Sequence, residues 1–241
     1  CFPIISSVSH AYIMFGIAFA VKYCLHHANM INLYRNDYYP TQEELYDVDY
    51  QLIAFDMDGT LLNSQKEISP ADPLDPLAAL AGKTVILNTG RCPAELEEYF
   101  ALLPDLTYVN CVSGALVYNH ATKETIYSRT LPVDTVKKKA DLDLGLDVEL
   151  ADAETTSLEI SAKGIHKGIG LSRLCEYLHI PLSQTIVVGD ADNDAAALQA
   201  AGLPVAMANA KDRIKALADV ITMQDNDHDG CAEVIQKYLL S

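Results

Sequence analysis

The sequence predicts an α/β fold, with a doubly wound, Rossmann-like, mostly parallel sheet as the core and a small inserted α+β cap domain. Short apolar runs that do not alternate with polar residues are typical of strands buried on both faces. Helical patterns separate these runs along most of the chain, which favours a parallel sheet. Between residues 116 and 162 this alternation stops, which marks the insertion. With 241 residues, half of them hydrophobic, the chain can bury one core and a smaller insertion.

The first core strand is predicted at residues 52–55, an apolar run that leads directly into Asp56 and Asp58. Ligands of open α/β sheets bind beyond the carboxyl ends of the strands, where these two carboxylates fall. If the chain stays extended, both side chains lie on the same side, and they repel each other unless a cation or a proton intervenes. Gly59 permits a tight turn and Thr60 supplies a hydroxyl. The alternative is a strand end followed by an ordinary Asp-Gly turn.

A second strand at residues 84–88 is followed by Thr89, Gly90 and Arg91. A hydroxyl, a glycine and a guanidinium at a strand end can bind a phosphate oxygen. The same residues also suit a plain strand-to-helix turn, so this triplet supports a phosphate site only together with the preceding strand. The flanking helices are predicted at residues 77–81 and 93–103.

The next block is predicted to contain mainly short strands. Its elements are a strand at 107–112, a hairpin at 115–127, a helix at 133–140 and two strands at 146–150 and 156–160. We expect the division into domains to be a core at residues 50–115 and 163–241 with a cap at 116–162.

Residues 163–168 precede an amphipathic helix that is predicted to run through His179, and Lys167 lies near its N-terminus. A lysine at a helix N-terminus adds a cation to a helix end that already attracts anions. Lys163 is the alternative candidate for this role, and a lysine solvated at a helix start is the alternative interpretation. We expect His166 to be a helix cap or a loop residue rather than a base.

A buried strand at residues 185–188 ends in Gly-Asp-Ala-Asp-Asn-Asp, which places Asp190, Asn193 and Asp194 at a strand end. Several carboxylates in one partly buried site disfavour joint ionisation unless a cation is present. Mg²⁺ prefers oxygen ligands and uses few carboxylates. An EF-hand is the competing metal site, but its glycine and distal glutamate spacing is missing. The remaining predicted elements are a helix at 195–201, a strand at 204–207, a helix at 211–217, a strand at 220–222 and a helix at 231–240.

Four motifs in this order, D-M-D-G-T-L-L, T-G-R, I-H-K-G and G-D-A-D-N-D, resemble those of the haloacid-dehalogenase-like (HAD) phosphatases. The resemblance covers residues 51–239 and is closest to the Cof-type branch. It implies that Asp56 is a nucleophile that forms an aspartyl-phosphate and that Asp58 is the general acid and base. The residues implied to bind phosphate are Thr89, Gly90, Lys167 and Asn193. The residues implied to hold Mg²⁺ are Asp56, Asp58 (through its backbone carbonyl), Asp190 and Asp194.

The resemblance implies a phosphatase that acts on a small phosphorylated metabolite, such as a sugar phosphate or a phosphorylated cofactor. The alternatives are a phosphosugar mutase of the same superfamily and a catalytically weak metabolite-binding protein. Asn88 stands where the family more often has a small residue, and Ser113 where it usually has asparagine. The cap is also shorter than is usual for this branch.

The net charge of −16 argues against nucleic acid and anionic membranes as partners. Six scattered cysteines without metal spacing favour a reduced, cytoplasmic setting. The atypical segment 1–49 contains an apolar run at residues 11–21 that is too short to span a membrane, so a membrane anchor is not expected. We expect residues 17–39 to form a helix–strand unit that docks on the cap. The sequence does not indicate an oligomeric state.

Overall fold

The computed structural model describes residues 48–68, 82–103, 106–130, 148–154 and 157–240. The predictions for residues 1–47, including the apolar run and the docking unit, lie outside the described residues, as do the helices predicted at 77–81 and 133–140. Among the described residues, no helix has the length and apolarity that crossing a membrane requires.

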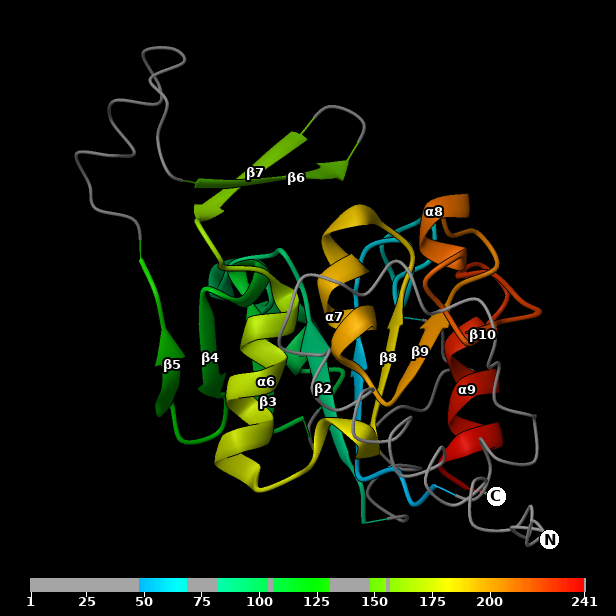
Figure 1. Cartoon of the computed structure of the whole chain (residues 1–241), viewed down its shortest axis with the longest axis horizontal. Coiled ribbons are helices and arrows are strands. Elements are labelled where there is room, and N and C mark those ends of the chain that lie inside the picture. The colour runs from blue at the N-terminus through cyan, green and yellow to red at the C-terminus, as the bar shows by residue number, and fades with distance from the viewer. Residues whose placement is uncertain (1–47, 69–81, 104–105, 131–147, 155–156, 241) are drawn as a thin grey trace, which may run out of the picture. The chain divides into compact units, whose positions relative to one another are not determined.

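An eight-stranded sheet forms the core, and its centre is parallel (Figure 1). Its spatial order is β10 (Val220–Ile221), β9 (Leu203–Ala206), β8 (Thr185–Gly189), β1 (Leu52–Phe55), β2 (Thr84–Asn88), β3 (Tyr108–Cys111), β4 (Leu116–Asn119) and β5 (Thr125–Ser128). β1 lies between β2 and β8 and pairs in parallel with both. All four of its residues are buried, as expected for a strand that is apolar on both faces. The predicted fold class is therefore confirmed.

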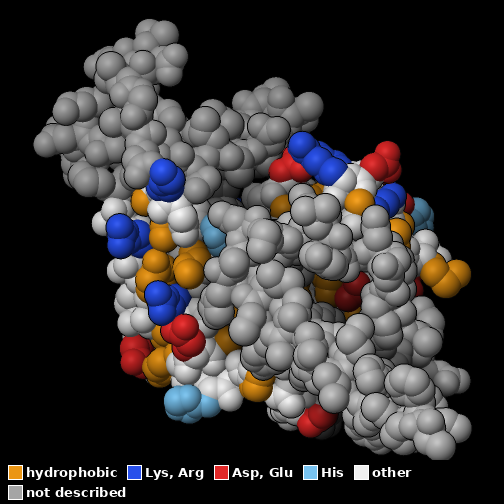
Figure 2. Space-filling view, in the orientation of Figure 1, with side chains coloured by type: hydrophobic (Ala, Val, Ile, Leu, Met, Phe, Trp, Pro, Cys, Tyr) orange, Lys and Arg blue, Asp and Glu red, His pale blue; other side chains and the backbone are white. Residues whose placement is uncertain are grey.

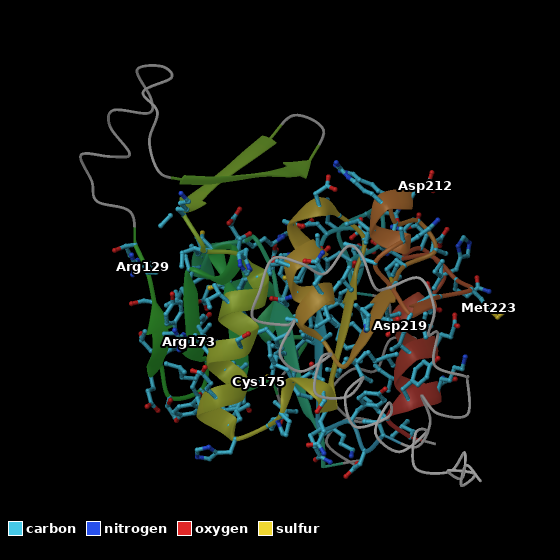
Figure 3. All side chains as sticks on the ribbon, in the orientation of Figure 1. Arg129, Arg173, Cys175, Asp212, Asp219 and Met223 are labelled. Atoms are coloured by element: carbon cyan, nitrogen blue, oxygen red, sulfur yellow. The ribbon has the colours of Figure 1, made fainter. Side chains whose placement is uncertain are left out.

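Helices cover the sheet, and α6 (Lys167–Leu178) and α7 (Ala195–Ala200) lie in front of it in Figure 1. Figure 3 places Arg173 and Cys175 on α6. Cys175 is buried against the core, whereas Arg173 lies over the ring of Tyr127 from β5. The other helices are α4 (Glu97–Phe100), α8 (Asp212–Lys215) and α9 (Gly230–Tyr238), with short 3₁₀ turns η2 (Pro93–Glu95), η3 (Val112–Gly114), η4 (Leu182–Gln184) and η5 (Asp192–Asp194).

The single helix predicted at residues 93–103 is wrong in its extent. The structure has the 3₁₀ turn η2 and the four-residue helix α4, and Leu96 separates them. Around Leu96 the backbone N–H of Leu96 donates to Pro93 and that of Tyr99 donates to Leu96, so bonds between residues three apart replace the regular α-helical pattern.

The hairpin that opens the predicted cap belongs to the core sheet instead. β4 pairs antiparallel with β3, and β5 pairs antiparallel with β4. Val117 is fully buried and Tyr118 nearly so, so the hairpin extends the core rather than opening a separate domain at residue 116. Further along, β6 (Val148–Glu154) and β7 (Ser157–Ala162) form a separate two-stranded antiparallel sheet. The division of the chain into core and cap otherwise stays a prediction.

Candidate active site

A buried lysine joins two carboxylates at the carboxyl end of the central strands. Lys167 is the first residue of α6 and has no solvent exposure. Its ammonium Nζ lies 2.6 Å from Oδ1 of Asp56, which directly follows β1, and 2.7 Å from Oδ1 of Asp194 at the start of α7. Three elements that are distant in the sequence therefore meet at one ammonium group, as the positions of their motifs predict. Lys163, the alternative candidate, is exposed before α6.

Asp190 completes an acidic group with Asp56 and Asp194. One carboxylate oxygen from each of the three residues lies within 4.8 Å of the others. Thr60 donates a hydrogen bond of 2.8 Å to Oδ1 of Asp190, and the backbone N–H groups of Asp190 and Ala191 donate to Oδ2 of Asp194. Three carboxylates and the one ammonium carry a net charge of −2 when all are ionised. A divalent cation that prefers oxygen ligands would neutralise the net charge of this group.

Burial and mutual repulsion shift the pKa values of this group. Burial raises the pKa of Asp56 well above its usual range, and the charge of Asp194 adds to the effect, while Lys167 opposes it. Burial and Asp194 also raise the pKa of Asp190 to about 6. For Lys167, burial lowers the pKa, but the carboxylates of Asp194 and Asp56 outweigh it and raise the pKa above its ordinary value. The ammonium therefore stays charged, and the carboxyl groups of Asp56 and Asp190 need further positive charge to ionise fully.

Asp58 lies among a separate set of cations. Nε and Nη2 of Arg91 donate to its two carboxylate oxygens at 2.7 and 2.8 Å, and Lys66 Nζ lies 2.7 Å from Oδ1. Tyr99 links the two cations, because its hydroxyl donates to the Lys66 carbonyl and accepts from Arg91 Nη1. Although burial raises the pKa of Asp58, the hydrogen bonds from Arg91 and Lys66 outweigh it and hold that pKa at about 2.

The chain does not stay extended beyond β1, which was the condition for Asp56 and Asp58 to share a side. The backbone N–H groups of Leu61 and Leu62 donate to the carbonyls of Asp56 and Met57, so the chain turns here. The two carboxylates consequently have different partners. The side chain of Asp58 is held by cations and lies outside the acidic group, so its backbone carbonyl is the atom that remains for the predicted metal role.

We expect replacement of Arg91 by leucine to raise the pKa of Asp58 by about 1–2 units, because a bidentate cation that favours the carboxylate is lost. An NMR titration of the aspartate carboxyl carbons in metal-free protein measures this. Arg173→Leu is the matched control, because Arg173 pairs with Glu176 on the surface of α6. An unchanged titration of Asp58 in Arg91→Leu would contradict the prediction.

The other predicted site residues lie close in sequence to these groups. Thr89 is buried directly after β2, and its Oγ1 accepts from the backbone N–H of Arg91 at 3.1 Å. Gly90 lies between them. Asn193 lies in η5, and its buried Oδ1 has no hydrogen-bond partner within the described part of the chain. The His166 side chain caps α6 by accepting from the Ile169 N–H, so the prediction that it is a cap is confirmed.

Sequence reasoning missed Lys66 and Tyr99 as neighbours of Asp58. Lys66 lies in a turn with a positive φ of 64°, and Tyr99 lies in α4, so neither follows a strand end. No local signal marks them, since only the folded chain brings them to Asp58.

Acidic and basic side chains also lie next to one another near α8 in Figure 2, where Asp192 pairs with Lys211 and Arg213.

A family model for haloacid dehalogenase-like hydrolases matches residues 53–151 and 139–235, which together make up more than half of the chain. A 5-amino-6-(5-phospho-D-ribitylamino)uracil phosphatase of Bacillus subtilis is 27% identical, over 80% of this chain and 98% of its own length. Among solved structures, a haloacid dehalogenase-like hydrolase from Bacteroides thetaiotaomicron has a TM-score of 0.67 at 24% identity and covers 78% of this chain and 99% of its own.

A HAD subclass IIB sugar phosphatase has a TM-score of 0.64 at 20% identity and covers 77% of this chain and 98% of its own. These solved structures share the fold with this chain, and the matched motifs include all the residues of the acidic group. The chain belongs to the haloacid dehalogenase-like hydrolase family, in its Cof-type branch.

Proposed function

We propose that this chain hydrolyses small phosphomonoesters in a Mg²⁺-dependent reaction that proceeds through an aspartyl-phosphate. The observation that carries the proposal is the buried Lys167 ammonium between Asp56 and Asp194, with Asp190 in the same group. A largely buried ion cluster with excess negative charge costs stability, and a site for a metal and a phosphoryl group explains why it is kept.

Asp56 is the proposed nucleophile. Its carboxylate attacks phosphorus in line, the bond to the leaving oxygen breaks, and an acyl phosphate forms on Asp56. Asp58 donates a proton to the leaving oxygen and later accepts one from the water that hydrolyses the intermediate. Arg91 and Lys66 hold Asp58 as the carboxylate in the free site, which is the form that the second step requires. The first step therefore requires Asp58 to take up a proton when the substrate binds, before it protonates the leaving oxygen.

Four residues are proposed to bind the phosphoryl group. Thr89 and Gly90 contribute a hydroxyl and a backbone N–H, Asn193 contributes its side-chain amide, and Lys167 offsets the charge that develops on the transferred group.

The donor set fits Mg²⁺. The carboxylates of Asp56, Asp190 and Asp194 are hard oxygen ligands with an excess charge that a divalent cation neutralises, and the Asp58 carbonyl is the fourth proposed ligand. When bound, Mg²⁺ supplies charge stabilisation for the transferred phosphoryl group. Small phosphorylated metabolites are the proposed substrates, because similar proteins include a phosphoribitylaminouracil phosphatase and a sugar phosphatase.

The test is phosphate release from a panel of sugar phosphates and phosphorylated cofactors, measured with Mg²⁺ and with EDTA. We expect release that requires Mg²⁺ and leaves the free alcohol. Transfer of the phosphoryl group back to a sugar, in place of release, would indicate a mutase. No release by folded protein on any substrate would contradict the proposal and favour a metabolite-binding protein.

Mg²⁺ is expected to stabilise the protein more at pH 7 than at pH 5. The carboxyl of Asp190 has a pKa of about 6 in the native state against an ordinary value of 3.8. The native state binds this proton more tightly than the unfolded state does. The protonated carboxyl of Asp190 therefore stabilises the native state below about pH 4, and this stabilisation is lost as pH rises through 6. Mg²⁺ competes with the proton, so its effect grows over the same range.

Thermal melts with and without Mg²⁺ at both pH values measure this. At a concentration 100 times its Kd, a ligand stabilises by about 2.7 kcal/mol, or roughly 5–10 °C for a chain of this size. Asp190→Asn should reduce the pH dependence of the Mg²⁺ effect, since it has no carboxyl to titrate, and Asp56, whose pKa is also raised, should account for what remains. Equal shifts at pH 5 and pH 7 in the wild-type protein would speak against the prediction.

A further inference from the structure

Two buried asparagines lie side by side where β2 and β3 end. Asn88 and Asn110 are register partners in the parallel pair, and neither has any solvent exposure. Nδ2 of Asn110 donates to Oδ1 of Asn88 at 2.6 Å and to the backbone carbonyl of Lys167 at 2.9 Å. The amide pair therefore connects two strands of the sheet to the first residue of α6.

Stability alone does not explain this pair. Nδ2 of Asn88 and Oδ1 of Asn110 have no hydrogen-bond partner among the described residues. A buried polar atom left unpaired costs about 1–3 kcal/mol, whereas two apolar side chains of the same shape carry no such cost. An arrangement that leaves two polar atoms unpaired in the core indicates a role other than packing.

The first turn of α6, which contains Lys167, lies in close contact with β3 and α7 at two glycines. A Cβ on Gly170 would lie 1.9 Å from Oδ1 of Asn110, so this helix turn lies directly against the amide. A Cβ on Gly168 would lie 2.4 Å from the Ala196 carbonyl. The Lys167 backbone is thereby held against β3 on one side and α7 on the other, while its ammonium reaches Asp56 and Asp194.

We propose that the Asn88–Asn110 amide pair positions Lys167 for phosphoryl transfer. The inference rests on the proposed function, in which the Lys167 ammonium offsets charge on the transferred group. Asn110 holds the main chain of Lys167, and Asn88 fixes the amide of Asn110 through the shorter bond. Neither asparagine touches the acidic group through an identified hydrogen bond, so both are positioning residues. If the Lys167 ammonium is displaced, its interaction with the transferred phosphoryl group weakens, and this interaction contributes most in the transition state.

The test compares Asn110→Ala and Asn110→Leu with the wild-type protein. Alanine removes the donor and leaves a cavity, whereas leucine removes the donor and keeps the volume. Thr185→Val is the matched control, because it also deletes one buried side-chain hydrogen bond to a carbonyl, that of Leu182, at 2.7 Å. Asn88→Ala tests the second member of the pair.

Two readouts separate positioning from packing. The first is kcat and KM for the best substrate of the panel, where we expect both Asn110 variants to lower kcat about 10- to 100-fold and to change KM less than 3-fold, and Asn88→Ala to have a smaller effect in the same direction. The second is proton exchange of the Lys167 ammonium by NMR in metal-free protein, which should become at least 10-fold faster. Thr185→Val should leave both unchanged.

Asn110→Leu with normal kcat and normal ammonium exchange would overturn the inference and leave the pair as core packing. Failure of the proposed function gives a different pattern, in which the wild-type protein itself releases no phosphate. The ammonium exchange still decides whether Asn110 positions Lys167 in that case, because it does not depend on turnover.

Discussion

Replacement of Asp56 by asparagine is expected to lower kcat for phosphate release by about 10⁴-fold or more. The amide is a poor nucleophile and cannot form the acyl phosphate, and removal of a nucleophile costs on the order of 10⁶ in well-studied covalent enzymes. Steady-state release in the presence of Mg²⁺ measures the loss. Acid quench of the wild-type protein with ³²P-labelled substrate should trap label on the chain, and the variant should trap none.

The same substitution should raise the stability of the metal-free protein at neutral pH. Burial and Asp194 raise the pKa of Asp56, so the ionised carboxylate destabilises the native state above its ordinary pKa of 3.8. Asparagine removes that charge and leaves Lys167 paired with Asp194. We therefore expect the free energy of unfolding of the metal-free variant to exceed that of the wild-type protein at neutral pH. Urea unfolding with EDTA measures it.

Asp49→Asn is the control for this gain, because Asp49 is exposed and pairs with Lys83 away from the acidic group. It should leave both kcat and stability nearly unchanged. An Asp56→Asn protein that is inactive because it is less stable would contradict the proposed balance of charges, whereas an inactive and more stable protein supports it.

Replacement of Lys167 by methionine should have the second largest effect. Loss of one electrostatic donor to the transition state lowers kcat by about 10²–10³-fold. It also leaves two carboxylates without their shared cation, and removal of one partner from a buried ion pair costs about 3–5 kcal/mol. Kinetics with Mg²⁺ and urea unfolding without it measure the two losses.

A double variant shows whether the destabilisation arises from unpaired charge. Lys167→Met combined with Asp56→Asn should recover part of the lost stability, because one of the two uncompensated carboxylates is gone. It should recover no activity. A recovery no larger than the stability that Asp56→Asn adds to the wild-type protein would show that the loss comes from packing of the long side chain rather than from charge.

The sequence predicted the central strands well, because β1 and β8 are buried on both faces and appear as continuous apolar runs. It failed where non-local packing decides. The hairpin of β4 and β5 alternates like any two-stranded hairpin, and only its pairing with β3 shows that it belongs to the core. The helix predicted at 93–103 failed for a local reason, since the hydrogen bonds around Leu96 join residues three apart and divide the segment into a 3₁₀ turn and a short α-helix.

Within the candidate site, the motifs predicted the residues that follow strands or begin helices. Asp56, Lys167 and Asp194 meet because parallel strands end at one edge of the sheet. The sequence did not predict the contacts of Asp58, since Lys66 and Tyr99 reach it from a turn and a short helix. Side-chain direction in such segments depends on tertiary packing, which periodicity does not encode.

The central place of β1 in the sheet also determines when the site can assemble during synthesis. Its partner β8 follows about 130 residues later, which at typical ribosomal rates is a delay of roughly 7–26 s. One edge of this wholly apolar strand is therefore unpaired while the intervening chain emerges, and the nascent protein exposes a surface on which chaperones or other nascent chains can act. Substitutions that delay pairing of β8 should consequently lower the yield of folded protein in cells more than they lower its stability once folded.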